Sequence, residues 1–316
     1  MKTINASIIT IGDELLIGQT IDTNSAWIAQ ELNKIGVWVR RRVAVGDVWN
    51  DIWNTLDEES RDSDIILITG GLGPTADDIT KPLLCKYFGG KLIVNEEVLK
   101  HVKYLFEKVY RRPGPMLQTN LKQAEVPDVC TVLHNARGTA PGMWFAPQPP
   151  KGGARKVFVS MPGVPHEMKG LMINEVLPRL KEAFDFPVIL HRTAFTMGTG
   201  ESMIAEKIKD FENSLPPHIR LAYLPGYGMV KLRLTAKGDD QETLEKELNE
   251  KFSALKERVS EWLVSDEDEN LAMAVQKILK EKNKTIGTAE SCTGGYIAHL
   301  ITSNPGSSVG YKGSIV

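Results

Sequence analysis

The sequence predicts an α/β protein whose first domain is a three-layer α/β/α structure around a mostly parallel sheet. Apolar runs at 6–11, 37–45 and 65–69 have the length of buried strands, and stretches of helical length separate them. Strands that alternate with helices in this way are typical of βαβ units, which place parallel strands in one sheet with helices on both faces. From about residue 186 the order changes, so a small α+β domain and the start of a third α/β domain are expected to follow.

Local patterns predict the elements of the first domain. A helix at 24–35, capped by Asn24 or Ser25, has an apolar face that includes Trp27 and Leu32. A second helix is expected at 48–60 and a third from about Thr75. Further along, we expect helices at 98–109 and 115–124, short strands at 130–133 and 142–145 that could form a hairpin, a loop at 147–154, a strand at 156–160 and a helix to about residue 184.

Three domains are predicted, at 1–185, 186–264 and 265–316. The middle domain has the order strand, helix, strand, strand, helix, with elements at 188–197, 200–212, 219–224, 229–236 and 240–262. A KH-type RNA-binding fold has a similar order and remains an alternative. The segment lacks a GXXG loop and has little basic charge, so binding of nucleic acid is not expected.

The segment 265–316 is short for an independent hydrophobic core. Its acidic start, SDEDEN (265–270), is interpreted as a linker or a helix cap, followed by a helix at 271–281 and a strand at 285–289. The chain ends at Val316, in what reads as a strand that has just begun. We therefore expect the truncated start of a third domain.

The composition argues against several classes of protein. A net charge of −2 over 316 residues gives no overall basic field for nucleic acid or an anionic membrane. The three cysteines have no metal-type spacing, and this favours a reducing cytoplasm over a disulfide framework. No signal-peptide pattern is present, and no apolar stretch approaches the ~20 residues of a membrane span. A cytoplasmic protein is expected.

The first segment whose residues could bind a ligand directly follows the first strand. Gly12, Asp13 and Glu14 lie at the carboxyl end of that strand, where open α/β sheets bind ligands, and Asn24 opens the next helix. Glycines allow backbone amides to approach an anion, and the carboxylates can hold a cation. A solvated turn followed by a helix cap explains the same residues equally well.

A glycine-rich loop after the strand at 65–69 is the second such segment. Its proposed ligand-binding residues are Gly70, Gly71, Gly73 and Thr75. The amides of such a loop can hold a phosphate at the start of the next helix. Asp77 and Asp78 are expected in the first turn of that helix, and they would repel a phosphate unless a divalent metal such as Mg²⁺ lay between them. A glycine-rich turn with two capping aspartates is the alternative.

Four longer motifs occur in order at strand ends: GDELLIGQTIDTNS (12–25), GGLGPTADDIT (70–80), NARGTAPG (135–142) and MPGVPHEM (161–168). Together they resemble the N-terminal domain of the CinA (competence/damage-inducible protein A) family, which is related to the molybdopterin-binding MoaB/MogA domains. GTGESMIAEKI (198–208) and LPGYGMVKLRLTA (224–236) resemble the middle domain of that family. TAESCTGGYIAHLITSNPGSS (288–308) resembles the start of its nicotinamide mononucleotide deamidase domain.

The resemblance implies a metal-dependent pyrophosphatase that acts on ADP-ribose-type dinucleotides. Asp78 then matches the aspartate of the family's glycine loop, Asp47 a second acidic position, and Asp13 and Glu14 the family's Gly-Asp-Glu. Asp77 and Asp78 are the metal candidates. Asp78, Asp47 and Glu14 are the catalytic candidates, with Asp47 as the base that activates water. Asp47 could equally be a helix cap.

Other motif residues receive more modest roles. Gly138, Thr139 and Gly163 are expected to shape the rim of the site. Glu167 is expected to lie in a solvated first turn of a helix. His134 is expected to be structural, as a histidine without a paired partner.

Ser291 follows a predicted strand and is expected to open a helix, where helix amides could serve an oxyanion. It matches the deamidase serine of the family, and a helix cap is the alternative. The tyrosine and lysine expected to assist that serine would lie beyond Val316. Deamidase activity is therefore expected only of an intact protein.

Two rival functions remain open. The first is a pterin-binding module without hydrolysis, like the MoaB/MogA relatives, and the second is an interaction or oligomerisation protein in competence. A homodimer is also expected, because Trp38, Trp49 and Trp53 cluster in one strand and helix and aromatic residues are enriched at interface cores. Internal packing of these tryptophans is the alternative. No membrane partner is expected.

Overall fold

The computed structural model describes residues 4–111, 116–149 and 155–316, and the chain divides into two compact units, Met1–Pro187 and Val188–Val316. The predicted loop at 147–154 and helix at 115–124 lie partly outside the described residues. None of the described helices is long and apolar enough to cross a bilayer.

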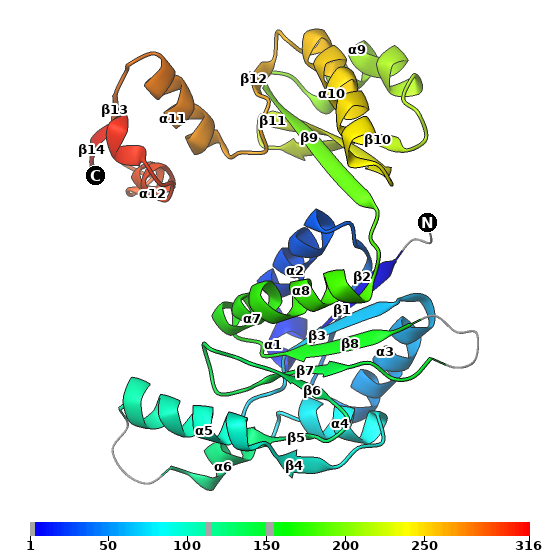
Figure 1. Cartoon of the computed structure of the whole chain (residues 1–316). Coiled ribbons are helices and arrows are strands. Elements are labelled where there is room, and N and C mark those ends of the chain that lie inside the picture. Colours follow the sequence, from blue (N-terminus) through cyan, green and yellow to red (C-terminus); the bar gives the residue numbers. More distant parts are fainter. Residues whose placement is uncertain (1–3, 112–115, 150–154) are drawn as a thin grey trace. The chain divides into compact units, whose positions relative to one another are not determined.

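A six-stranded sheet, in the order β2-β1-β3-β8-β7-β6, forms the centre of the first unit (Figure 1). Its strands are β1 (Asn5–Ile11), β2 (Trp38–Val45), β3 (Ile65–Thr69), β6 (Thr131–Leu133), β7 (Gly142–Phe145) and β8 (Val157–Met161). The strands β2, β1, β3 and β8 run parallel to one another. β7 pairs antiparallel with both β8 and β6, and β6 and β7 form the expected hairpin. All residues of β3 and β8 are buried, as expected for strands covered on both faces.

Helices cover both faces of this sheet (Figure 1). On one face α2 (Thr23–Lys34), α7 (Pro165–Leu171) and α8 (Leu177–Ala183) pack against Ile8, Leu67 and Val159. On the other, α3 (Trp49–Asp62) and α4 (Thr80–Tyr87) pack against Ile9, Ile66 and Ile68. The alternation of Ile8 and Ile9 to opposite faces follows from the pleat of a strand. The predicted three-layer fold is confirmed.

The segment that connects α4 to β6 was only partly predicted. The helix α5 (Glu96–Tyr104) and the π-helical turn Leu105–Val109 match the expected helix. The strands β4 (Leu92–Val94) and β5 (Glu125–Pro127), which pair antiparallel, were missed. α6 (Gln118–Leu121) and a 3₁₀ turn at Lys122–Ala124 lie between α5 and β5. Buried Lys81 ties this segment to α4, because its Nζ donates to the carbonyls of Lys122 and Gln123, and its burial lowers its pKa to about 8.

Two helix starts differ from the prediction. The N-cap of α2 is Asp22, whose carboxylate accepts from Ser25 N at 2.9 Å, rather than Asn24 or Ser25. α4 begins at Thr80 rather than at Thr75. The carboxylate of Asp78 binds backbone N–H groups of the preceding loop, which keeps residues 73–78 in a turn outside the helix.

A four-stranded antiparallel sheet, in the order β10-β11-β9-β12, opens the second unit. It contains β9 (Val188–Met197), β10 (Ile219–Gly226), β11 (Met229–Gly238) and the unpredicted β12 (Leu263–Ser265), with α9 (Glu201–Asn213) and α10 (Gln241–Arg258). Alternating residues of β11 are buried in its core. α10 ends four residues before Trp262, which still packs against that core.

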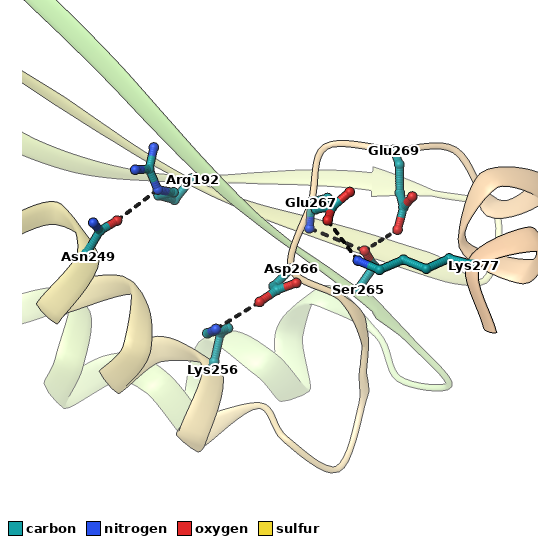
Figure 2. Close-up of polar contacts among 8 residues, drawn as sticks. All are labelled: Arg192, Asn249, Lys256, Ser265, Asp266, Glu267, Glu269 and Lys277. Carbon is teal, nitrogen blue, oxygen red and sulfur yellow. Dashed lines mark hydrogen bonds and ion pairs between the residues drawn. The ribbon is translucent and has the colours of Figure 1, made fainter. Parts of the chain in front are cut away.

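The acidic segment after β12 is tied down by polar contacts (Figure 2). Asp266 pairs with Lys256 at 2.9 Å, Glu267 pairs with Lys277 at 2.7 Å, and buried Glu269 accepts from Ser265 Oγ. Asn270 caps α11 (Leu271–Glu281), so the alternative of a helix cap is confirmed. α12 (Tyr296–Thr302) and the parallel strands β13 (Ile286–Ala289) and β14 (Tyr311–Ile315) follow.

Candidate functional site

A pocket of about 100 Å³ lies in the first unit at the carboxyl ends of β1 and β3. Its polar lining residues are Thr10, Glu14, Thr20, Asp22, Thr23, Asn24 and Thr69. Ile11, Leu15, Ile21, Gly163 and Pro165 complete the lining. This is the edge at which parallel α/β sheets bind ligands. The structure therefore brings Glu14, Asn24 and Gly163 together, as predicted for a site at this edge.

Thr10 and Thr69 are pocket residues that the sequence interpretation missed, and Asp22 lies in the 12–25 motif but was not named as a site residue. A threonine near the end of an otherwise apolar strand is a signal that could have revealed Thr10 and Thr69. Asp22 caps α2, and its Oδ2 also lies 3.3 Å from Thr10 Oγ1. The cap therefore fixes a carboxylate in the wall of the pocket.

The side-chain amide of Asn24 is held in one orientation. Its Nδ2 donates to the carbonyl oxygen of Gly163 at 2.7 Å and lies 3.4 Å from Thr69 Oγ1. A flipped amide would place its oxygen against that carbonyl. Its Oδ1 is consequently fixed as an acceptor, and this buried atom has no hydrogen-bond partner among the described residues. An unpaired buried acceptor of this kind is costly.

An acidic group lies beside the pocket, where β1 and β2 end. Asp13 and Asp47 bind each other reciprocally: Asp13 N donates to Asp47 Oδ2 at 3.2 Å, and Asp47 N donates to Asp13 Oδ1 at 3.1 Å. Burial raises the pKa of Asp47 most, the hydrogen bond from Asp13 N opposes this, and the charges of Asp13, Glu14 and Asp77 raise it further. Carboxylates from three separate segments of the chain thus lie close enough for their charges to act on Asp47.

Asp78 has a different environment from the one predicted. Its Oδ1 accepts from Gly73 N at 2.7 Å and its Oδ2 from Thr75 N at 2.9 Å, with Thr75 Oγ1 as a further donor. It does not lie in the first turn of a helix, because α4 begins two residues later. The contacts show Asp78 fastening the glycine-rich loop, while its neighbour Asp77 is exposed.

The glycines of this loop are required by contacts inside the protein. A Cβ on Gly70 would lie 2.1 Å from the carbonyl oxygen of Ile11, and one on Gly71 would lie 2.1 Å from Thr80 Oγ1. Both glycines have positive φ, 113° and 64°. Gly73 is crowded by Asp78, and Gly12 by the carboxylate of Glu14. The glycine pattern therefore has a packing explanation, and this weakens the pattern alone as evidence for a phosphate-binding loop.

Gly138 and Thr139 are not among the residues that line the pocket. Gly138 lies against Glu167, whose carboxylate would be 1.9 Å from a Cβ at that position. Glu167 also accepts from Asn135 Nδ2 at 2.6 Å, and burial raises its pKa. The expectation of a solvated Glu167 is therefore wrong: the side chain is half-buried because it holds the 135–140 loop.

His134 has an aromatic partner that the sequence did not indicate, and this contact agrees with the structural role expected of it. Its ring and that of His101 are 4.7 Å apart, edge to face. His101 Nε2 lies 2.9 Å from the carbonyl oxygen of Asn135, and burial lowers the pKa of His101. These contacts connect α5 to the same loop.

Ser291 lies in the second unit, in a turn rather than at a helix start. α12 begins at Tyr296 with Gly295 as its N-cap, so the expected placement of Ser291 is wrong. The free N–H groups at the start of α12 are bound by Glu290 instead, because its carboxylate accepts hydrogen bonds from Ile297 N and Ala298 N. These bonds, against the opposing effect of burial, lower the pKa of Glu290 to about 2.

No group of three His, Cys, Asp or Glu side chains in 4–111, 116–149 and 155–316 is arranged to hold a metal ion by itself. Mg²⁺ usually takes only one or two protein carboxylates and completes its shell with water and substrate phosphates. The exposed carboxylates of Asp13, Glu14 and Asp77 have the oxygen donors for such a site. The donor set therefore fits a metal that binds together with a phosphorylated substrate.

Family models match three consecutive parts of the chain. Residues 7–182 match a probable molybdopterin binding domain, residues 191–264 the damage-inducible protein CinA KH domain, and residues 268–316 the CinA C-terminal domain. A CinA-like protein of Flavobacterium psychrophilum is 50% identical over 312 residues, which cover 98% of this chain and 73% of that protein.

The chain belongs to the CinA family.

A CinA-like protein of Cytophaga hutchinsonii is 47% identical over 313 residues, with 99% of this chain and 73% of that protein covered. Among solved structures, the protein CinA of Thermoplasma acidophilum is 34% identical, with a TM-score of 0.49, and covers 58% of this chain and 99% of its own. The tungsten cofactor synthesizing protein MoaB of Pyrococcus furiosus is 21% identical, with a TM-score of 0.40. That match covers 58% of this chain and 99% of the MoaB chain. The KH alternative for the middle domain thus agrees with the family description of that domain.

Proposed function

We propose that the first unit is a metal-dependent pyrophosphatase that hydrolyses ADP-ribose-type dinucleotides. The observation that carries the proposal is the gathering of carboxylates beside a pocket: Asp13 and Asp47 bind each other at the ends of β1 and β2, Glu14 lines the pocket, and the charges of Asp13, Glu14 and Asp77 help to raise the pKa of Asp47. Four carboxylates in one place repel one another, which favours a cation between them and a phosphorylated ligand. A carboxylate with a raised pKa beside a pocket, such as Asp47, is typical of functional sites.

The residues divide the work of cleavage as follows. Asp77 and Glu14 would hold the divalent cation, which when bound neutralises diphosphate oxygens. Asp47, with its raised pKa, accepts a proton from water as the water oxygen attacks phosphorus. The bond from that phosphorus to the bridging oxygen breaks, and the products are AMP and ribose 5-phosphate. Asp78 positions the glycine loop and takes no proton.

A pterin-binding module without hydrolysis is the second candidate, favoured by the family description of residues 7–182 as a probable molybdopterin binding domain. The two candidates differ in turnover. Incubation with ADP-ribose and Mg²⁺, followed by chromatography, is expected to release AMP and ribose 5-phosphate in equal amounts. Tight binding of a pterin with no products from any dinucleotide would favour the module instead.

The match over 268–316 supports a proposal about proteins that carry the whole C-terminal domain. We propose that a protein with the whole C-terminal domain deamidates nicotinamide mononucleotide, with Ser291 as its nucleophile. The match to the CinA C-terminal domain over 268–316 supports this proposal. A role in competence, as an interaction or oligomerisation protein, is compatible with the family membership and independent of either activity.

A further inference from the structure

Residues 265–270 connect the four-stranded sheet of the second unit to its last part, residues 271–316. Residues 266–268 form a bend, and residues 269–270 belong to no helix or strand. The hydrophobic core of the sheet and its helices α9 and α10 contains no residue of 271–316, all of which the structure describes. Apolar packing in that core therefore does not hold 271–316, and the polar contacts of the connection become the attachment to consider.

Two carboxylates of this connection bind lysines that belong to the sheet and one of its helices. Asp266 pairs with Lys256 of α10 at 2.9 Å, and Asp268 pairs with Lys231 of β11 at 2.8 Å. α10 and β11 pack in the same core. Both ion pairs therefore attach the connection to one folded body.

The carboxylate between these two, Glu267, pairs in the other direction. Its partner is Lys277 of α11, at 2.7 Å (Figure 2). On either side of the charged residues, Ser265 Oγ donates to buried Glu269, and Asn270 caps the start of α11. The ends of the connection are thus fixed by hydrogen bonds, whereas its middle depends on ion pairs to both sides.

These ion pairs act on one another across the connection. The hydrogen bond from Lys256 lowers the pKa of Asp266 most, and the charge of Lys277 lowers it further. The hydrogen bond to Glu267 raises the pKa of Lys277 most, and the charge of Asp266 adds to this. Both groups therefore stay ionised at neutral pH. A single exposed ion pair contributes little and is screened by salt, so salt is the variable to which such a set responds.

We propose that residues 265–270 form an electrostatic clasp, which when closed fixes residues 271–316 on the sheet and when open leaves them as a tethered, independently moving segment. Salt opens the clasp, because its middle depends on ion pairs, and leaves the packed core intact. The clasp decides whether Ser291 moves with the sheet or apart from it. This inference does not depend on the proposed cleavage in the first unit.

Time-resolved fluorescence anisotropy of the whole chain, with a dye on Cys292, tests the clasp. Cys292 is exposed, whereas Cys85 is buried and Cys130 is half-buried. A Cys292→Ser protein that takes up no dye shows that the label is on this thiol. Raising NaCl from ~0.1 M to ~1 M shortens the screening length from ~10 Å to ~3 Å, so the amplitude of fast segmental rotation is expected to rise at least ~2-fold.

Charge reversal opens the clasp without salt. Asp266→Lys combined with Asp268→Lys is expected to give the high-salt rotation already at ~0.1 M NaCl, where wild type rotates slowly. Glu250→Lys combined with Glu281→Lys is the matched control. It changes the net charge equally, at two exposed carboxylates of α10 and α11 for which the structure shows no ion pair among the described residues, and is expected to rotate like wild type.

Reversed pairs separate the loss of ion pairs from a loss of folding. Lys256→Asp and Lys231→Asp, added to the charge reversal, re-form both pairs with opposite sense and are expected to return the slow rotation. Circular dichroism on heating shows which variants are folded, and the salt titration of wild type needs no variant.

Fast rotation of wild type already at low salt, or rotation that salt does not change, would overturn the clasp. So would an equal effect of the control pair, or fast rotation that persists in a folded protein with reversed pairs.

Discussion

Asp47 is the residue on which the proposed chemistry depends most. Its pKa is raised by partial burial and by three neighbouring carboxylates. A raised pKa makes a carboxylate a better base, and general-base catalysis contributes typically ~10²–10⁴-fold to a rate. In the other proposed role, as a helix cap, Asp47 would matter for stability alone, but the N-cap of α3 is Val48.

Replacement of Asp47 by Asn is expected to lower kcat for ADP-ribose cleavage by ~10²-fold or more. The same change is expected to raise the melting temperature at pH 7 in the absence of metal. The folded state holds the Asp47 proton more tightly than the unfolded state, so stability is lost as pH rises from the ordinary value of 3.8 through the raised pKa. Asn has no such loss.

Thermal melting from pH 4 to pH 8 and steady-state kinetics check both effects. Asp51→Asn, at an exposed carboxylate in the first turn of α3, is the matched control and is expected to change neither. A folded Asp47→Asn protein with normal kcat would remove Asp47 from the mechanism.

Asp77 and Asp78 are adjacent, yet the structure gives them different roles. Asp77 is exposed, whereas both oxygens of Asp78 accept hydrogen bonds from the loop at Gly73 and Thr75. We expect Asp77→Ala to weaken Mg²⁺ binding with little change in stability. We expect Asp78→Ala to lower the free energy of unfolding by about 1–2 kcal/mol, because loop hydrogen bonds are lost.

Denaturant titration and Mg²⁺ titration in the presence of AMP measure the two quantities. The reverse pattern, with a stable Asp78→Ala protein that has lost its metal, would restore Asp78 as the ligand that the sequence predicted.

Among the elements, the glycine-rich loop between β3 and α4 is shaped by its neighbours as much as by any ligand. Gly71→Ala is expected to destabilise the protein by well over the ~1 kcal/mol of a left-handed conformation, since the new Cβ would meet Thr80 Oγ1 at 2.1 Å. Gly18→Ala is the matched control, because Gly18 also has positive φ, 73°, but open space around it.

Free energies of unfolding from denaturant titration compare the two variants. A Gly71→Ala protein no less stable than Gly18→Ala would show that Thr80 yields easily, and the glycine would then need another explanation, such as the approach of a ligand.

Sequence patterns predicted the helices and strands well where the spacing of apolar residues indicates one kind of element. The strands at 65–69 and 188–197 and the helix at 271–281 match the structure to the residue. An uninterrupted apolar run defines the first strand, and Asn270 caps the start of the helix. The misses have a different cause. β4, β5 and β12 are three residues long, too short to show a period, and they depend on tertiary pairing.

The candidate site shows the same division between local and tertiary information. Glu14, Asn24 and Gly163 were found because motifs at strand ends mark the binding edge of an α/β sheet. Glu167 was misjudged because its role depends on a partner far along the chain. Thr69 could have been suspected from its place at the end of an apolar strand, but its contact with a distant loop could not. Glu167 binds Asn135, and Thr69 binds the carbonyl of Pro162. No local pattern shows which loop will fold over a given helix.

At the scale of the whole molecule, the expected homodimer loses part of its basis. Trp49 and Trp53 pack against the core of the first unit, and Trp38 alone of the three is largely exposed, at 48%. A dimer is still the prediction, now with Trp38 at its interface. Light scattering at micromolar concentration should give twice the 35.0 kDa of one chain, and Trp38→Ala should give a single chain. A wild-type monomer would contradict this.

The central claim is that carboxylates at the ends of β1, β2 and the glycine loop support metal-dependent cleavage of a diphosphate. The most direct measurement is a time course of AMP and ribose 5-phosphate from ADP-ribose, with Mg²⁺, with EDTA, and with Asp47→Asn. The account predicts both products at equal rates with Mg²⁺, none with EDTA and a loss of at least ~10²-fold with the variant. Product formation that is indifferent to EDTA and to Asp47, or no cleavage by the wild-type protein, would contradict it.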